Sequence, residues 1–274
     1  MDLVIVGHLG LNDDVTPFGR AVSPGGAGYA VAKGARLLGP GRVGLVARVG
    51  PDFDRNAVLS MGVDAEGVTV HEGRSPRFYM RQHADNSREF TADMGTGNTI
   101  APDELPAPYR RARHVHLATA PPQQQWAWLT FLRTLPARPA VSVDMFEHFA
   151  SSDPALCRSL CAAADLLFMN DEERHILYGD GPLPSAPAVV KHGPLGASYC
   201  GTLVPTTAAD PVDTTGAGEV LAGVFLALRL AGEDPLPALT AAVRAATAKV
   251  TEFGMDGAGL ATAIDEIAAH ICAA

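Results

Sequence analysis

The chain has 274 residues, of which 47% are hydrophobic, and 21 basic residues against 30 acidic ones give a formal charge of −9. A chain of this length and apolar content can bury a large core, which excludes a disordered or fibrous protein. The negative charge argues against a nucleic-acid partner. The four scattered cysteines do not form a disulfide scaffold.

The sequence carries no pattern typical of membrane insertion or export. No apolar run approaches eighteen residues, and the segment Met1–Gly7 has no basic region before its apolar residues. We therefore expect a soluble cytoplasmic protein with no membrane partner.

Short apolar runs predict buried strands, because such runs between polar flanks are typical of a parallel sheet covered on both faces. The runs are Leu3–Val6, Val43–Val49, His114–Leu117, Ala140–Asp144, Asp165–Met169 and Ala188–Lys191. Helical segments lie between them, at residues 27–38, 53–61, 122–135, 154–163 and 171–178. Further helices follow at 217–231, 235–252 and 259–272. This alternation predicts an α/β fold with a mostly parallel sheet.

Two regions interrupt the alternation. The extended segments 77–82 and 88–92 flank the turn Asp85-Asn86-Ser87, and residues 14–24 contain Pro and Gly without a helical period. They predict a small β-lobe, or lid, formed by about 11–24 and 76–93. Because no repeat or long linker divides the chain, we expect a single domain over residues 1–274.

A glycine motif at Gly39–Gly44 matches the spacing of a dinucleotide-binding loop. That loop must leave a strand and begin a helix, whereas this segment ends a predicted helix and leads into a strand. Its glycines are therefore interpreted as a helix cap and a turn. The chain also has no Walker-type phosphate loop, so any phosphate chemistry needs another cradle.

The candidate cradle is the segment Asp213–Glu219, which precedes an apolar helix. Gly216, Ala217 and Gly218 leave backbone N–H groups free at a helix start, where the helix dipole also attracts an anion. Glu219 would lie beside that anion as a general base, as phosphoryl transfer to a hydroxyl requires. The alternative interpretation is structural: a glycine-rich helix start followed by an acidic residue that favours the first turn.

Together these residues resemble the PfkB carbohydrate kinase family, also called ribokinase-like. Its C-terminal signature is matched by Asp213–Gly218 with Leu221-Ala222-Gly223. Its N-terminal signature is matched by the segments Gly25-Gly26, Leu38-Gly39, Val49-Gly50 and Asp52. The resemblance implies a doubly wound sheet flanked by helices, with a β-lid.

The same resemblance implies an ATP-dependent kinase that phosphorylates a hydroxyl of a small sugar, cyclitol, polyol or nucleoside. ATP and Mg²⁺ are the implied cofactors, and a monovalent cation near Asp213 is left open. A homodimer through the lid is also left open.

Further site residues follow from the resemblance. Asn170 and Glu173 match the family motif that organises Mg²⁺, although Asn followed three residues later by Glu is also close to a helix capping box. The nucleotide would lie along Lys191, Gly193, Gly196, Val250 and Phe253. The alternatives are that Lys191 is a strand-end lysine reaching solvent and that the apolar pair belongs to the core.

The substrate side of the predicted site is the end of the first strand. The family places a hydroxyl-binding Asp there, and the register leaves Asn12, Asp13 and Asp14 as candidates, together with Gly25 and Gly26. An ordinary polar turn is the alternative.

Two positions depart from the family pattern. Glu219 stands where the family has its catalytic Asp, and Ala30 stands where it has a substrate-contacting Asn. A methylene moves the carboxylate by roughly 1 Å, and a shift of that size can cost about 100-fold in rate. The alternative function is therefore a non-catalytic or weakly active ligand-binding protein of this family.

Overall fold

The computed structural model describes residues 1–39, 41–83 and 88–272, and within them nine strands form one large sheet in the order β13-β12-β11-β10-β9-β8-β1-β4-β5. From β11 to β5 neighbouring strands are parallel, while β12 and β13 add an antiparallel edge. The strands are β1 Leu3–Val6, β4 Val43–Val49, β5 Val68–Val70, β8 His114–Leu117, β9 Ala140–Asp144, β10 Leu166–Asn170, β11 Ala188–Lys191, β12 Ala197–Tyr199 and β13 Thr202–Val204.

Helices cover both faces of this sheet, so its central strands are buried throughout. One core lies between the sheet and α1, α7, α8 and α9, and the second lies between the opposite face and α3, α5 and α6. The α-helices are α1 Ala27–Ala35, α2 Asn56–Leu59, α3 Pro122–Thr134, α4 Glu147–Ser152, α5 Pro154–Ala163, α6 Asp171–Tyr178, α7 Ala217–Ala231, α8 Pro235–Val250 and α9 Ala258–Cys272. Short 3-10 turns are η1 Arg36–Leu38, η2 Gly95–Asn98, η3 Pro102–Glu104, η4 Ala107–Arg111 and η5 Gly193–Leu195.

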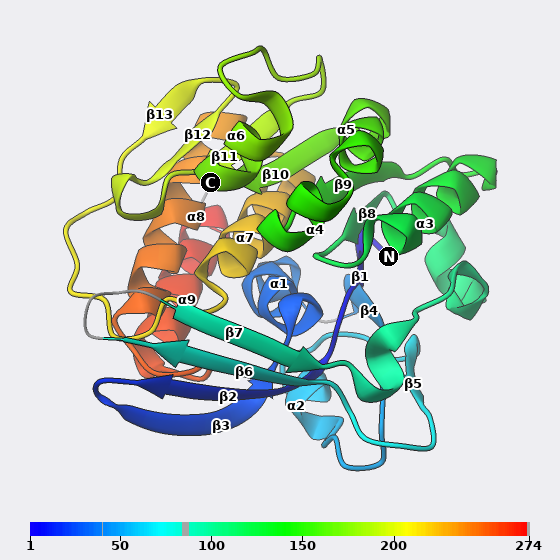
Figure 1. Ribbon diagram of the computed structural model, residues 1–274, viewed down its shortest axis with the longest axis horizontal. Helices are drawn as coiled ribbons and strands as arrows, with labels where there is room; N and C mark the ends of the chain where they lie inside the picture. The colour runs from blue at the N-terminus through cyan, green and yellow to red at the C-terminus, as the bar shows by residue number, and fades with distance from the viewer. Residues whose placement is uncertain (40, 84–87, 273–274) are drawn as a thin grey trace.

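The described part of the chain also forms a separate four-stranded sheet, in the order β3-β2-β6-β7. Its strands are β2 Gly10–Thr16, β3 Gly19–Gly25, β6 Arg77–Gln82 and β7 Arg88–Asp93. Figure 1 shows these strands side by side below α1, where they form a layer apart from the large sheet. The predicted α/β architecture and the small second sheet are both confirmed; we call the second sheet the lid.

Two glycines bring α1 and α7 into close contact. A Cβ on Gly34 would clash with the carbonyl oxygen of Val220, and a Cβ on Gly223 would clash with that of Val31. Both clashes are with backbone, which cannot move aside. The contact therefore fixes the start of α7 relative to α1 and the glycine pair that precedes it.

One predicted helix was wrong in extent. The segment expected at 53–61 contains only the four-residue α2, because Asp54 accepts the N–H of Asn56 in a turn and the chain turns again near Gly62. The cap and turn assigned to the glycine motif are confirmed: Gly39 ends η1 with a φ of 84° and Gly41 has a φ of 72°. The predicted turn at Asp85–Ser87 lies outside the described residues.

Within the described residues, no helix is long and apolar enough to cross a bilayer.

Candidate active site

The start of α7 has the geometry of an anion site. Gly216 precedes the helix in a left-handed conformation, with a φ of 77°, which glycine adopts without strain. The first N–H groups of a helix have no acceptor within the helix and can bind a ligand. Here the Ala217 N–H makes only a long contact, 3.4 Å, with the carbonyl of Thr214. Glu219 lies in this first turn, partly buried.

Lys191 lies directly against this turn. A Cβ on Gly218 would lie 3.1 Å from Lys191 Cδ and 3.4 Å from its Nζ, so the glycine gives the lysine room. The ammonium donates to the carboxylate of Asp144 at 2.7 Å. Burial lowers the pKa of Lys191, but the carboxylates of Asp144, Glu173 and Glu219 outweigh it and hold this pKa above its usual range. The lysine is a fixed positive charge at the anion site.

Glu219 lies in the field of several buried groups. Burial raises the pKa of its carboxyl, Lys191 lowers it, and Asp144 raises it again. A carboxyl with a raised pKa accepts a proton more readily than an exposed glutamate does. This environment suits a general base.

Asn170 and Glu173 form the capping box at the start of α6. Asn170 Oδ1 accepts from the Glu173 backbone N–H at 2.8 Å, and Glu173 accepts from the backbone N–H and the side-chain amide of Asn170 at 2.7 and 2.9 Å. Burial raises the pKa of Glu173 to about 7, against a lowering effect of Lys191. Both carboxylate oxygens thus bind protein donors, so Glu173 can act on a metal through water rather than as a direct ligand.

The described residues contain no group of three or more His, Cys, Asp or Glu side chains arranged to hold a metal ion. Mg²⁺ keeps several waters and binds through substrate phosphates in sites of this kind. The donors near the α7 start therefore fit an ATP-bound Mg²⁺ with Glu173 and Asn170 near its waters, and they do not fit a metal held by protein alone.

The predicted substrate residues divide between the two faces of β2. Buried and partly buried residues alternate along this strand, and the buried Asn12 and Asp14 face the body of the protein. Asn12 Oδ1 accepts from the Gly26 N–H at 3.2 Å and lies against Gly25, so these three residues are brought together.

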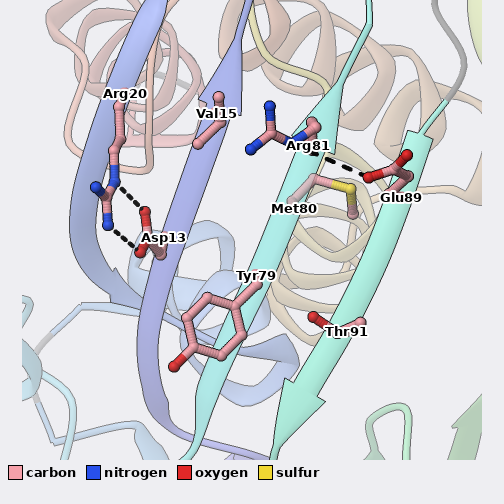
Figure 2. Close-up of a pocket in the computed structure, with 8 residues that line it drawn as sticks. All are labelled: Asp13, Val15, Arg20, Tyr79, Met80, Arg81, Glu89 and Thr91. Atoms are coloured by element: carbon pink, nitrogen blue, oxygen red, sulfur yellow. Dashed lines mark hydrogen bonds and ion pairs between the residues drawn. The ribbon is translucent and has the colours of Figure 1, made fainter.

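Asp13 does not join them. Both its oxygens bind Arg20 at 2.6 Å on the outer face of the lid. Figure 2 shows this pair on the strand surface. The prediction that included Asp13 among the substrate residues therefore disagrees with the geometry.

Asp14 is buried, and neither of its carboxylate oxygens has a partner at hydrogen-bond geometry among the described residues, although the nearby side chain of Asn12 lowers its pKa. Burial raises the pKa of Asp14 to about 7, with a further contribution from the charge of Asp213. An unpartnered buried carboxyl carries an energetic cost that a hydroxyl donor from a ligand would relieve.

The predicted nucleotide residues lie around one end of the antiparallel edge. Gly193 and Gly196 bound the turn η5 between β11 and β12, with φ values of 55° and 107°. Val250 ends α8, and its carbonyl accepts the N–H groups of Val212 and Asp213. Phe253 is partly exposed in the bend that follows. Through these hydrogen bonds Val250 lies beside the loop that leads to α7.

The chain has a clear match among known protein families. The chain matches the pfkB family of carbohydrate kinases over residues 6–260. It belongs to that family.

Curated relatives of this pfkB protein are kinases. It is 30% identical to a cytidine kinase of Thermococcus kodakarensis over 251 residues, 83% of this chain and 88% of the relative. It is 32% identical to an ATP-dependent ribose-1-phosphate kinase of Halopiger xanaduensis, over 92% of this chain and 88% of the relative. Ribokinase from Cryptococcus neoformans, solved with ADP, shares the fold at a TM-score of 0.80 and 19% identity, covering 97% of this chain and 99% of that one.

Family membership and these relatives support an ATP-dependent kinase acting on a sugar or a nucleoside. A putative ribokinase II of E. coli, with a TM-score of 0.79 and 18% identity over 97% of this chain and 99% of that one, was solved with ATP and Mg²⁺. The cytoplasmic location and the absence of a nucleic-acid partner stay predictions.

Two residues at this site were not predicted from the sequence. Asp144 ends β9 and binds Lys191, and Lys249 binds Asp213. Their signal was weak: an acid at a strand end, and the scarcity of lysine, which occurs at only three positions of the chain. Each of the three lysines, including Lys33 with Asp256, forms an ion pair with an aspartate.

The oxygens of Asp213, near which a monovalent cation was left open, bind the ammonium of Lys249. Both the carboxylate Oδ2 and the backbone carbonyl of Asp213 bind the ammonium of Lys249, at 2.8 and 3.0 Å. The side chains of Lys249 and Asp213 are 0% and 1% exposed. The oxygens that would hold a free cation are thus taken by the chain itself, so the residues present do not fit one.

Proposed function

We propose that this protein transfers the γ-phosphoryl group of ATP to a hydroxyl of a sugar or nucleoside, with Glu219 as the base. The observation that carries the proposal is the first turn of α7, where the backbone N–H groups of the helix start, Glu219 and Lys191 lie together. Negative charge develops on the transferred group, and preorganised donors of this kind stabilise it.

The proposed roles follow from position. The N–H groups of Gly216, Ala217 and Gly218 bind the transferring phosphoryl, and Lys191 adds a charge that stays positive. Glu219 accepts the proton of the attacking hydroxyl. Mg²⁺ on the ATP phosphates supplies charge neutralisation when bound, with Asn170 and Glu173 beside its waters. The remaining nucleotide contacts come from Gly193, Gly196, Val250 and Phe253.

The acceptor lies between the lid and α7 in this proposal. Asp14 binds its hydroxyls, which would supply the donors that the Asp14 carboxyl lacks. Asn12 holds Gly25 and Gly26 in place at the edge of this proposed acceptor site. Ala30 lies close to Gly216, because a Cβ on Gly216 would be 3.4 Å from the Cβ of Ala30. The small side chain leaves room for the longer carboxylate of Glu219.

An aromatic pair favours a nucleoside as the acceptor. Phe90 on the lid meets Phe146 at the start of α4, with ring centroids 5.9 Å apart in an edge-to-face arrangement. Phe90 is 45% exposed and shares its register with Met80 and Asp14. Two strand spacings separate Phe90 from Asp14, about 10 Å between backbones. This distance fits a ribose at Asp14 and a base against the aromatic pair.

A homodimer through the lid belongs to the same proposal. The outer face carries exposed Val22 and Tyr79 and a hollow of about 330 Å³ beside the Asp13–Arg20 pair (Figure 2). Exposed apolar side chains on a sheet face are typical of an interface. Light scattering tests it: a dimer that Tyr79→Arg converts to a monomer supports the lid contact, and a monomeric wild-type protein contradicts it.

Two measurements test the proposed activity. Calorimetry with ATP and Mg²⁺ is expected to show binding at millimolar concentration. A panel of ribose, ribose 1-phosphate, inositol and cytidine is expected to stimulate ADP release with at least one acceptor. The kinase proposal fails if ATP with Mg²⁺ gives neither heat nor a thermal shift and no acceptor stimulates the release of ADP. The alternative, a ligand-binding protein of this family, would then be favoured.

A further inference from the structure

The loop that leads into α7 is anchored by a buried ammonium. Lys249, near the end of α8, donates to Asp213 Oδ2 at 2.8 Å and to the Asp213 carbonyl at 3.0 Å. Lys249 is fully buried, which is rare for a lysine unless a partner compensates its charge. One ammonium thus binds a side chain and the backbone of the same residue.

The remaining contacts of Asp213 complete the anchor. Its Oδ1 accepts the N–H of Thr215 at 2.8 Å, and its Oδ2 accepts the N–H of Gly254 at 3.0 Å. The backbone of Asp213 binds the carbonyl of Val250. The loop before Gly216 is therefore tied to the end of α8 on both sides of Asp213, with Lys249 at the centre.

Three carboxyl groups lie near the ammonium of Lys249 and favour a positive charge at this position. Burial lowers the pKa of Lys249 below its usual value, and the carboxyls of Asp213, Asp14 and Glu219 act against this by favouring the charged ammonium. Within the part of the chain that the structure describes, the carboxylate oxygens of Asp14 have no partner at hydrogen-bond geometry, and Glu219 lies in the first turn of α7. Without a positive charge here, buried carboxyls would face one another close to the site of a triphosphate.

We infer that Lys249 serves as the built-in monovalent cation of this enzyme: its tethered ammonium holds the Asp213 loop in shape, so that catalysis needs no K⁺ or Na⁺. A carboxylate oxygen together with a carbonyl oxygen is a donor set that a bare cation would use, and here the ammonium of Lys249 binds both oxygens. Lys249 is a positioning residue, because it acts on the phosphoryl site through Asp213 and the loop.

This inference rests on the proposed function of α7, so its test includes a reading that does not need turnover. The thermal midpoint and the rate of ADP release are measured in KCl, NaCl and choline chloride at equal ionic strength. For the wild-type protein we expect rates within about twofold and midpoints within about one degree across the three salts.

A variant without the Lys249 ammonium should depend on an added cation, which the wild-type protein should not. Lys249→Ala opens space beside Asp213, and we expect at least a tenfold loss of kcat in choline chloride. KCl or ammonium chloride should restore part of this loss and raise the thermal midpoint of the variant by several degrees. Lys33→Ala is the matched control, since Lys33 also pairs with an aspartate, Asp256, but lies outside the anchor. It should respond to the salts as the wild type does.

Each outcome decides the inference. A wild-type rate or thermal midpoint that rises selectively with K⁺ or Na⁺ over choline reveals a separate cation site and overturns it. A Lys249→Ala variant with full activity in choline chloride also overturns it. If that variant does not fold, the salt series on the wild-type protein still decides, and if no acceptor is found, the thermal midpoints decide alone.

Discussion

The ammonium of Lys191 binds the carboxylate of Asp144 at 2.7 Å and joins the ends of β11 and β9 across the intervening strand β10. The same lysine packs against Gly218 in the first turn of α7. Asp144 therefore decides where the positive charge lies relative to the anion site.

Asp144→Asn should release Lys191 from this position. We expect kcat/KM for ATP to fall about 10- to 100-fold, because misplacing a group by about 1 Å has that cost. Loss of one partner of a buried pair should also lower the free energy of unfolding by about 3 kcal/mol. Asp265→Asn, which breaks the exposed pair with Arg36, is the control and should leave kcat/KM unchanged. Wild-type kinetics in Asp144→Asn would show that Lys191 is held by other means.

Asp14 makes stability depend on pH. Its pKa of about 7 in the folded protein lies above that of an aspartate in the unfolded chain, about 3.9, so the folded state binds this proton more tightly. The free energy by which Asp14 destabilises the folded protein therefore grows as the pH rises from about 4 to 7. Asp14→Asn should raise the free energy of unfolding by about 4 kcal/mol at pH 8 and by only about 1.5 kcal/mol at pH 5.

Urea denaturation at the two pH values checks this difference. Asp13→Asn, on the opposite face of the strand, is the control and should show no such gain. Asp14→Asn should also lose acceptor binding, because the carboxyl is the proposed hydroxyl ligand. A destabilised Asp14→Asn protein at pH 8 would mean that the carboxylate has a stabilising partner.

Phe146→Ala tests whether the acceptor is a nucleoside. Stacking of a base on an aromatic ring is worth about 1–3 kcal/mol, so kcat/KM for cytidine should fall about 5- to 150-fold. The value for ribose should change less than twofold. Phe131→Ala removes an aromatic ring that packs on Trp128 elsewhere and serves as the control. An equal loss for both acceptors would exclude the base-stacking role.

Glu173→Gln separates the metal role from the capping role. We expect the Mg²⁺ concentration at half-maximal rate to rise about tenfold, while the loss in unfolding free energy stays near 1 kcal/mol, typical of a cap. Asp153→Ala removes the cap of α5 through Leu156 and offers the comparison. It should cost similar stability and leave the Mg²⁺ requirement unchanged. Identical Mg²⁺ titrations for Glu173→Gln and wild type would leave Glu173 with its capping role alone.

The sequence predicts the parts of the site that depend on local pattern. The α7 start at Gly216 and the Asn170 cap each lie within a few residues of the element they begin, so spacing alone identifies them. The buried strands follow in the same way from apolar runs. The length of α2 was predicted wrongly, because a turn in which the Asp54 side chain accepts from the Asn56 N–H competes with the helix.

Contacts between distant segments could not be predicted in that way. Lys249 and Asp213 are 36 residues apart, and Lys191 and Asp144 are 47 apart, so their pairing depends on which elements become neighbours. The face of Asp13 was missed for a related reason. Successive residues of a strand point to opposite faces, so the choice between Asp13 and Asp14 needs the register of β2, which the lid contacts determine.

The central claim is that Glu219 is the catalytic base, and the rate of Glu219→Gln with the acceptor that the panel identifies tests it most directly. We predict that kcat falls about 100-fold or more while ATP affinity stays unchanged, because a general base contributes about 10²–10⁴-fold. Glu219→Asp should also be slower than wild type if the pocket suits the longer side chain. Full activity of Glu219→Gln would contradict the claim, and a faster Glu219→Asp would mark the glutamate as a weakened form of the family site.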